Sequence, residues 1–228
     1  MAAPTFHYRR MVDLSQPLRT GQQQHPWFRY ETQVESIVAD PATAPSTGRW
    51  YVVTQLHLSG HAGTHVEAPY HAMADGATVG ALPVERFFGE AVILDLRDVP
   101  WSQPVDQPRL VAAAQQAGGV RDGDIVFLHF DWAGRAVDGS YPPYPTTTAL
   151  AWLVAQGIKL LGIDTPGLEL PNNKALVNHR LLFEQGIPLI ESLVNLAALT
   201  SSRVYVFAQP LPVYDTDAMP LRVLAFEG

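Results

Sequence analysis

The segment HAGTHVEAPYH, residues 61–71, constrains the fold and chemistry of this chain more than any other stretch. It places His61, His65, Glu67 and His71 in one short run whose other members are mostly small or turn-forming. Neutral imidazole and carboxylate are ligands that zinc and manganese accept, and several of them must converge to hold an ion. The segment therefore predicts a metal site, and the fold has to bring these side chains together.

The spacing within the segment favours such convergence. His61 and His65 would lie one turn apart in a helix or tight turn, and Glu67 would return to the same side if the chain then runs extended. Pro69 excludes a continuous helix, and Gly63 lets the backbone bend closely around an ion.

A metal-free interpretation has to be weighed beside this one. Histidines also occur in protein cores with both ring nitrogens hydrogen-bonded, or on surfaces where they titrate without consequence. That interpretation suits a single histidine better than four ligand-type residues together. Structural zinc sites lean on cysteine, and this chain has none. We therefore expect an open, catalytic site.

Composition limits the classes of function. The chain has 228 residues, 47% of them hydrophobic, which predicts one domain spanning residues 1–228. A formal net charge of −7 without a Lys/Arg run argues against a nucleic-acid partner. No apolar stretch approaches the roughly 20 residues that span a membrane. The N-terminus lacks the apolar region of a signal peptide, so we expect a cytoplasmic protein.

Strands and helices alternate after an irregular N-terminal third, which predicts an α/β fold. Strands are expected at residues 50–58, 92–96, 125–130, 159–163, 203–208 and 221–225. Helices are expected at residues 108–117, at 149–156 after Thr146 and Thr147 as caps, and at 179–185 after Asn178 as cap.

The chain resembles the metal-dependent cyclase and kynurenine formamidase superfamily. The residues that carry this resemblance begin with HAGTHVEAPYH, which is similar to the superfamily pattern HxGTHxDxPxH. Further matching stretches follow in the expected order: DLS at 13–15, residues 75–96, GDIVFLHFDW at 123–132, GIKLLGIDTPGLE at 157–169, residues 178–193 and AMPLRVLAF at 218–226. The resemblance implies a single mixed sheet of the swivelling β/β/α type.

The resemblance also implies a ligand set. His61, His65 and Glu67 would hold one metal, Glu67 would reach a second, and His179 and Glu191 would complete a binuclear site. Taken alone, His179 reads as an ordinary surface histidine. Glu191 directly follows the apolar run IPLI. A buried, unpaired carboxylate there would be costly, and a cation would offset the cost.

His71 is implied as the general acid/base. In the implied mechanism a metal-activated water attacks a carbonyl carbon, and an imidazole passes the proton of that water to the leaving group. No alternative nucleophile competes, because the sequence has no Cys, no GxSxG and no SxxK.

One departure from the superfamily pattern affects the metal count. Residue 67 is Glu where the superfamily usually has Asp, and the extra methylene changes how the carboxylate bridges two ions. One or two ions therefore remain open, with two favoured because His179 and Glu191 are both present. Zinc is expected, with manganese as the alternative.

The expected reaction is hydrolysis of a C–N amide bond in a small aromatic compound, such as N-formylkynurenine or the cyclic amide isatin. Trp27 matches an aromatic that lines the pocket in formamidases, whereas a packed core Trp is the other interpretation. Hydrolysis or cyclisation of a lactone or polyketide-type ring, and metal binding without catalysis, are the alternatives. The resemblance further implies a homodimer or homotetramer, and a structural role for Arg222.

Overall fold

The computed structural model describes residues 7–20, 33–38, 52–132, 141–170 and 173–228. Within these ranges the largest element is a nine-stranded sheet. Its strands, in spatial order, are β1 (Arg10–Asp13), β13 (Leu224–Glu227), β11 (Arg203–Phe207), β5 (Phe88–Asp95), β7 (Ile125–His129), β9 (Leu160–Ile163), β10 (Leu189–Glu191), β4 (His65–Glu67) and β12 (Ala218–Pro220).

The sheet is mixed, and its parallel part lies in the middle. Strands β5, β7, β9 and β10 are parallel, so their carboxyl ends meet at one edge of the sheet. The outer strands on both sides pair antiparallel, including β4 with β10 and β12 with β4. The predicted α/β class with a mixed sheet is confirmed.

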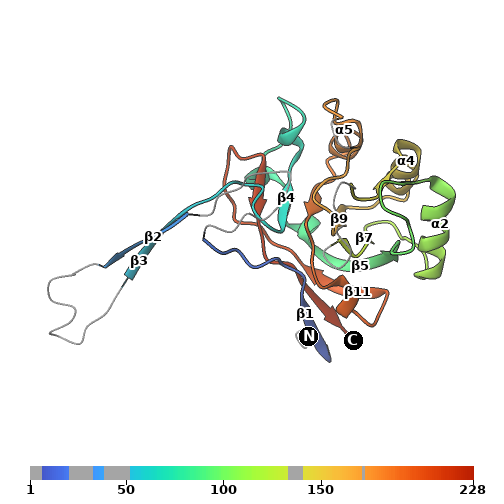
Figure 1. Ribbon diagram of the computed structural model, residues 1–228, viewed down its shortest axis with the longest axis horizontal. Coiled ribbons are helices and arrows are strands. Elements are labelled where there is room, and N and C mark those ends of the chain that lie inside the picture. Colours follow the sequence, from blue (N-terminus) through green and yellow to red (C-terminus); the bar gives the residue numbers. More distant parts are fainter. Residues whose placement is uncertain (1–6, 21–32, 39–51, 133–140, 171–172) are drawn as a thin grey trace, which may run out of the picture.

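Helices α2 (Gln107–Gln116), α4 (Thr147–Ala155) and α5 (Val177–Phe183) lie together along one side of the sheet (Figure 1). Helix α2 begins after Asp106, whose carboxylate accepts a hydrogen bond from the Arg109 N–H. Helix α4 begins after Thr146, whose hydroxyl accepts from the Ala149 N–H, as the sequence predicts.

Strand β5 separates two hydrophobic cores, because its side chains alternate between the two faces of the sheet. Val92 and Leu94 belong to the core beneath the helices. Ala91 and Ile93 point the other way, into a second core that also contains Phe127 and lies inside the curl of the sheet. Both faces of the central strands are therefore buried, as is usual for parallel sheets.

Two predictions from the sequence need correction. Asn178 does not cap the third helix but lies within α5, which follows Leu176 and has no side-chain cap at that residue. The expected strand at 221–225 is interrupted, because the chain forms β12 before it and resumes as β13 at Leu224. Leu221 instead forms an isolated bridge with Pro210.

The remaining elements are short. Strands β2 (Gln33–Val38) and β3 (Val52–His57) form an antiparallel hairpin that projects from the body of the molecule, so the strand expected at 50–58 is present in its central part (Figure 1). Strands β6 (Pro104–Val105) and β8 (Tyr144–Pro145) pair with each other. Single 3₁₀ turns occur at η1 (Pro69–His71), η2 (Val79–Ala81), η3 (Val84–Phe87) and η4 (Leu196–Ala198). Among the described helices, none has the length and apolar character needed to cross a bilayer.

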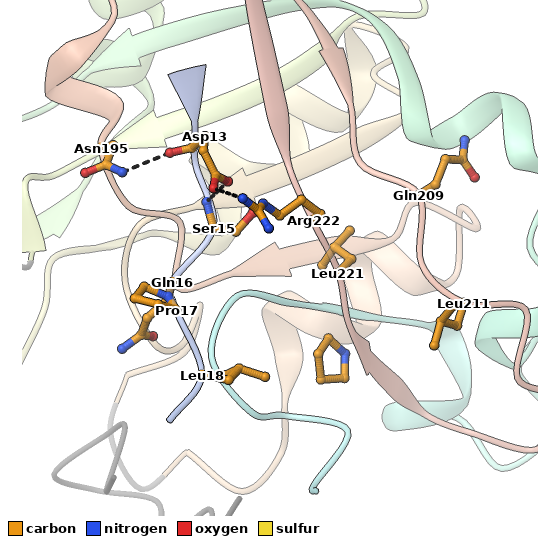
Figure 2. Close-up of a pocket in the computed structure, with 11 residues that line it drawn as sticks. Asp13, Ser15, Gln16, Pro17, Leu18, Asn195, Gln209, Leu211, Leu221 and Arg222 are labelled. Atoms are coloured by element: carbon orange, nitrogen blue, oxygen red, sulfur yellow. Dashed lines mark hydrogen bonds and ion pairs between the residues drawn. The ribbon is translucent and has the colours of Figure 1, made fainter. Parts of the chain in front are cut away.

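Arg222 pairs with Asp13, which supports the structural role expected for it. The two side chains are 2.6 Å apart and connect the end of β1 to the segment between β12 and β13. They lie beside an open cavity of about 630 Å³ that also contacts Gln209 and Leu221 (Figure 2).

Candidate metal centre

Two antiparallel strands present the first three candidate ligands. In β4 the side chains of His65 and Glu67 share one face, because they are two residues apart, while Val66 points into the second core. Glu191 ends β10 directly opposite His65. All three ligand-type side chains are buried, with exposed fractions of 3–4%.

The turn before β4 orients the His65 ring. Gly63 adopts a left-handed conformation with φ of 62°, which a glycine accepts without strain. Its carbonyl accepts a hydrogen bond from His65 Nδ1 at 2.8 Å. That bond leaves the Nε2 lone pair of His65 directed toward the cluster, as is typical of metal-binding histidines.

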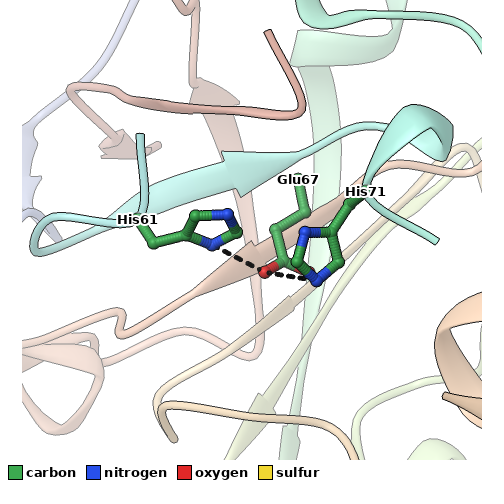
Figure 3. Close-up of side chains that lie close together, drawn as sticks. All are labelled: His61, Glu67 and His71. Carbon is green, nitrogen blue, oxygen red and sulfur yellow. Dashed lines mark ion pairs between the residues drawn. The ribbon is translucent and has the colours of Figure 1, made fainter. Parts of the chain in front are cut away.

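His71 approaches the Glu67 carboxylate from the 3₁₀ turn η1, which begins at Pro69. Its Nε2 lies 3.7 Å from Glu67 Oε1, and His61 Nδ1 lies 3.0 Å from the same oxygen (Figure 3). His61, Glu67 and His71 thus surround one point with three ligand atoms.

His179 reaches the cluster from helix α5. Its Nδ1 faces Glu169 Oε1 at 3.2 Å, and Glu169 also accepts the backbone N–H groups of Asn178 and His179. This carboxylate therefore satisfies the start of α5 in place of the predicted Asn178 cap. The other ring nitrogen of His179 lies 3.2 Å from Glu67 Oε2 and 3.6 Å from Glu191 Oε1.

The spacing of these atoms fits ions. Ligand atoms about 2.1 Å from a tetrahedral ion lie about 3.4 Å from one another. Around Glu67 Oε1, the atoms His61 Nδ1 and His65 Nε2 are 3.0 and 3.6 Å away and 3.2 Å apart. His179 Nε2 is at comparable distances from Glu67 Oε2 and Glu191 Oε1. Glu67 thus offers one oxygen to each of two ligand groups.

Two buried oxygens are unsatisfied among the described residues, and both face His179. They are Glu67 Oε2 and Glu191 Oε1, which have no hydrogen-bond partner there. Buried carboxylate oxygens are costly without a partner, so a cation between them and His179 fits the arrangement.

The pKa values show how protons compensate the carboxylates without a cation. Burial alone would lower the pKa of His61, but hydrogen bonds with Glu67 and Asp217 raise it to about 9. Burial alone would raise the pKa of Glu67, but the neighbouring imidazoles of His179 and His61 hold it well below its usual range. Burial alone would lower the pKa of His179, but the neighbouring carboxylates of Glu169, Glu191 and Glu67 raise it well above its usual range. The cluster thus favours positive charge.

Asp217 is a site residue that the sequence analysis missed. Its Oδ2 lies 2.8 Å from His61 Nε2 and 3.0 Å from His71 Nδ1. It arrives from a distant part of the chain, because β12 pairs with β4 and places Ala218 opposite Glu67. No local motif marks it, so only the strand pairing could have revealed it.

Comparison with known families agrees with this geometry. The family model described as "Putative cyclase" matches residues 12–170, which include the histidine segment. The chain belongs to this family.

Curated relatives in sequence are kynurenine formamidases. That of Erythrobacter litoralis is 28% identical over 96% of this chain and 94% of its own length. That of Bordetella avium is 29% identical over 77% of this chain and 80% of its own length.

Among solved structures, isatin hydrolase A from Labrenzia aggregata, bound to benzyl benzoate, superposes with a TM-score of 0.81 at 25% identity. The match covers 96% of this chain and 93% of that one. Isatin hydrolase A from Ralstonia solanacearum gives a TM-score of 0.79 at 25% identity, over 96% of this chain and 92% of that one. The fold of this cyclase-family chain is thus that of the isatin hydrolases.

The structure brings together six of the residues singled out in the sequence of this cyclase-family member. Side chains of one cluster come from β4, its preceding turn, η1, α5 and β10: His61, His65, Glu67, His71, His179 and Glu191. Trp27 lies outside the described residues. Trp132, which ends the matching stretch 123–132, packs edge-on against Trp101 with ring centroids 4.7 Å apart.

Proposed function

We propose that this protein is a metal-dependent hydrolase that cleaves a non-peptide C–N amide bond of a small aromatic substrate. Arylformamides such as N-formylkynurenine and cyclic amides such as isatin are the proposed substrate class. Relatives named kynurenine formamidase and structural neighbours named isatin hydrolase support this assignment.

The observation that carries the proposal is the shared carboxylate of Glu67. One of its oxygens faces His61 and His65, and the other is a buried atom without a hydrogen-bond partner among the described residues that faces His179. We assign His61, His65 and Glu67 to one ion, and Glu67, His179 and Glu191 to a second. The longer Glu side chain would let each oxygen reach a different ligand group, which supports two ions rather than one.

A bound divalent ion activates water and polarises the substrate carbonyl. Imidazole and carboxylate suit zinc and manganese alike, and we propose zinc first. His71 is the proposed general acid/base. Its Nε2 faces Glu67 Oε1, which is also the oxygen that faces the first ligand group. His71 would take the proton of the attacking water when the tetrahedral carbon forms, and it would then give that proton to the departing nitrogen.

Trp27 is proposed to contact the aromatic part of the substrate, on the strength of the sequence resemblance. The same resemblance supports a homodimer or homotetramer.

A substrate panel tests the reaction class. Zinc- or manganese-loaded protein would be offered N-formylkynurenine, isatin and an aromatic lactone of similar size. We expect hydrolysis of at least one amide with a kcat/KM at least tenfold above that for the lactone, and loss of that activity in Glu67→Gln. Preferential turnover of the lactone would replace the amidase assignment by the ring-hydrolase alternative. Metal uptake without turnover of any substrate would favour a non-catalytic site.

A further inference from the structure

Asp217 contacts two imidazoles that have different proposed roles. Its Oδ2 lies between His61, a proposed metal ligand, and His71, the proposed acid/base. The Asp217 backbone is fixed independently of this side chain, because its carbonyl accepts the Ala68 N–H at 2.8 Å and β12 begins at the next residue. A change limited to the Asp217 carboxylate therefore leaves the strand pairing of β12 and β4 in place.

The contacts define which nitrogen of each ring carries hydrogen. A carboxylate oxygen accepts hydrogen bonds, so His61 must donate from Nε2 and His71 from Nδ1. The lone pair of neutral His61 is then on Nδ1, the atom 3.0 Å from Glu67 Oε1. The lone pair of neutral His71 is on Nε2, which also faces that oxygen. The Asp217 carboxylate thus directs two atoms toward Glu67 Oε1. They are His61 Nδ1, the proposed metal-binding atom, and His71 Nε2, the proposed proton acceptor.

We propose that Asp217 is the positioning residue that fixes the tautomers and ring orientations of His61 and His71 together. The part that concerns His71 rests on the proposed hydrolase function, whereas the part that concerns His61 needs only metal binding. The exposed fraction of the Asp217 side chain, 42%, indicates that its influence comes from direction and tautomer rather than from a strong buried ion pair.

Asp217→Ala is the informative substitution. Both rings donate to the same oxygen, Oδ2, and alanine removes it, so both imidazoles lose the bond that fixes their tautomers. Loss of an outer hydrogen bond to a ligating histidine costs typically about 10–100-fold in metal affinity or activity. Asp217→Asn keeps one oxygen that can accept from both rings, so it should retain more of the zinc affinity than Asp217→Ala does.

Asp215→Asn is the matched control. Asp215 is exposed, lies two residues earlier on the same loop and already has a positive φ of 62°, which Asn tolerates. It removes the same charge from the same loop without touching either histidine, so it separates positioning from a general loss of negative charge.

The first measurement is the affinity of chelator-stripped protein for zinc, by competition with a chromogenic chelator. We expect Asp217→Ala to bind about 10–100-fold more weakly and Asp215→Asn to bind within about twofold of the unchanged protein. The second measurement is ¹⁵N NMR of the imidazole nitrogens in the zinc-loaded protein, where the expected hydrogens on His61 Nε2 and His71 Nδ1 should be lost or moved in Asp217→Ala. The third is kcat and KM at saturating zinc, where kcat should fall about tenfold or more and KM should change little.

Unchanged zinc affinity together with unchanged imidazole tautomers in Asp217→Ala would overturn the proposal. An equal loss of affinity in Asp215→Asn would also overturn it, because charge rather than position would then explain the effect. If the unchanged protein hydrolyses no amide, the hydrolase function fails, and zinc affinity and NMR still decide the role of Asp217.

Discussion

Glu67 is the residue on which both proposed ions depend, and its two oxygens face different sets of histidines. The nearest histidine nitrogen to Oε1 belongs to His61, at 3.0 Å, and His179 lies 3.2 Å from Oε2. His71 is close enough to the first set to serve as a ligand as well as a base. Metal content and turnover must therefore be measured separately for variants of His71.

His71→Ala should abolish most turnover while leaving the bound metal in place. General acid/base catalysis is worth about 10²–10⁴ in rate, so kcat should fall by that factor. Metal content by elemental analysis should match that of the unchanged protein. A fall in metal content of one ion per chain would instead make His71 a ligand, and a near-normal kcat would remove its acid/base role.

At the scale of elements, the parallel strands depend on a close contact between β7 and β9. Gly162 lies opposite Phe127 in the strand register. A Cβ at residue 162 would lie 2.5 Å from the Phe127 ring and 2.9 Å from Leu193, whereas real Cβ atoms do not approach so closely. Glycine at residue 162 therefore makes room for the fully buried Phe127 ring. Strand β10, which pairs with β9, then carries Glu191.

Gly162→Ala should destabilise the protein by about 1–3 kcal/mol, because the new methyl overpacks the core. Gly167→Ala is the control, since nothing lies within 4 Å of the added Cβ there. Urea unfolding followed by circular dichroism compares the two variants. Equal midpoints for both would show that Phe127 moves aside without cost.

Elements and residue clusters with local signals could be predicted from the sequence, whereas the roles of the clustered residues stay predictions. His61, His65, Glu67 and His71 lie in one segment, so the turn and strand that join them could be anticipated from Gly63, Pro69 and the alternation of side chains. His179 and Glu191 came from the family resemblance, because nothing local links α5 and β10 to β4. Asp217 was missed for the same reason: only the pairing of β12 with β4 brings it to the site.

The error over Asn178 has a physical cause of the same kind. Asn is a common cap, but here Glu169, nine residues earlier, accepts the Asn178 and His179 N–H groups. That carboxylate also faces the His179 ring, so Glu169 both accepts the first N–H groups of α5 and orients His179. A single domain over residues 1–228 and the role of Trp27 stay predictions.

For the whole molecule, metal binding and folding should be coupled through the buried carboxylates. Removing the ions leaves Glu67 and Glu191 compensated only by protonated histidines, so chelator treatment should lower the melting temperature. The pKa of His61, about 9 without metal against an ordinary 6.5, sets the pH dependence. Because this pKa is raised, its contribution to the stability of metal-free protein is present below pH 6.5 and is lost as pH rises through about 9.

Metal binding should show the opposite trend, because the ion displaces that proton. Apparent affinity should rise by up to about tenfold per pH unit between pH 7 and 9 for each proton displaced. Melting curves with and without zinc across this range check both trends. Melting temperatures of metal-free and zinc-loaded protein that stay parallel over the range would contradict the coupling at His61.

The most direct test of the central claim is hydrolysis of N-formylkynurenine by chelator-stripped protein before and after zinc or manganese is added back. We expect negligible hydrolysis by the stripped protein and recovery that saturates at two ions per chain. Full activity in the stripped protein, with no change on adding either metal, would contradict the claim.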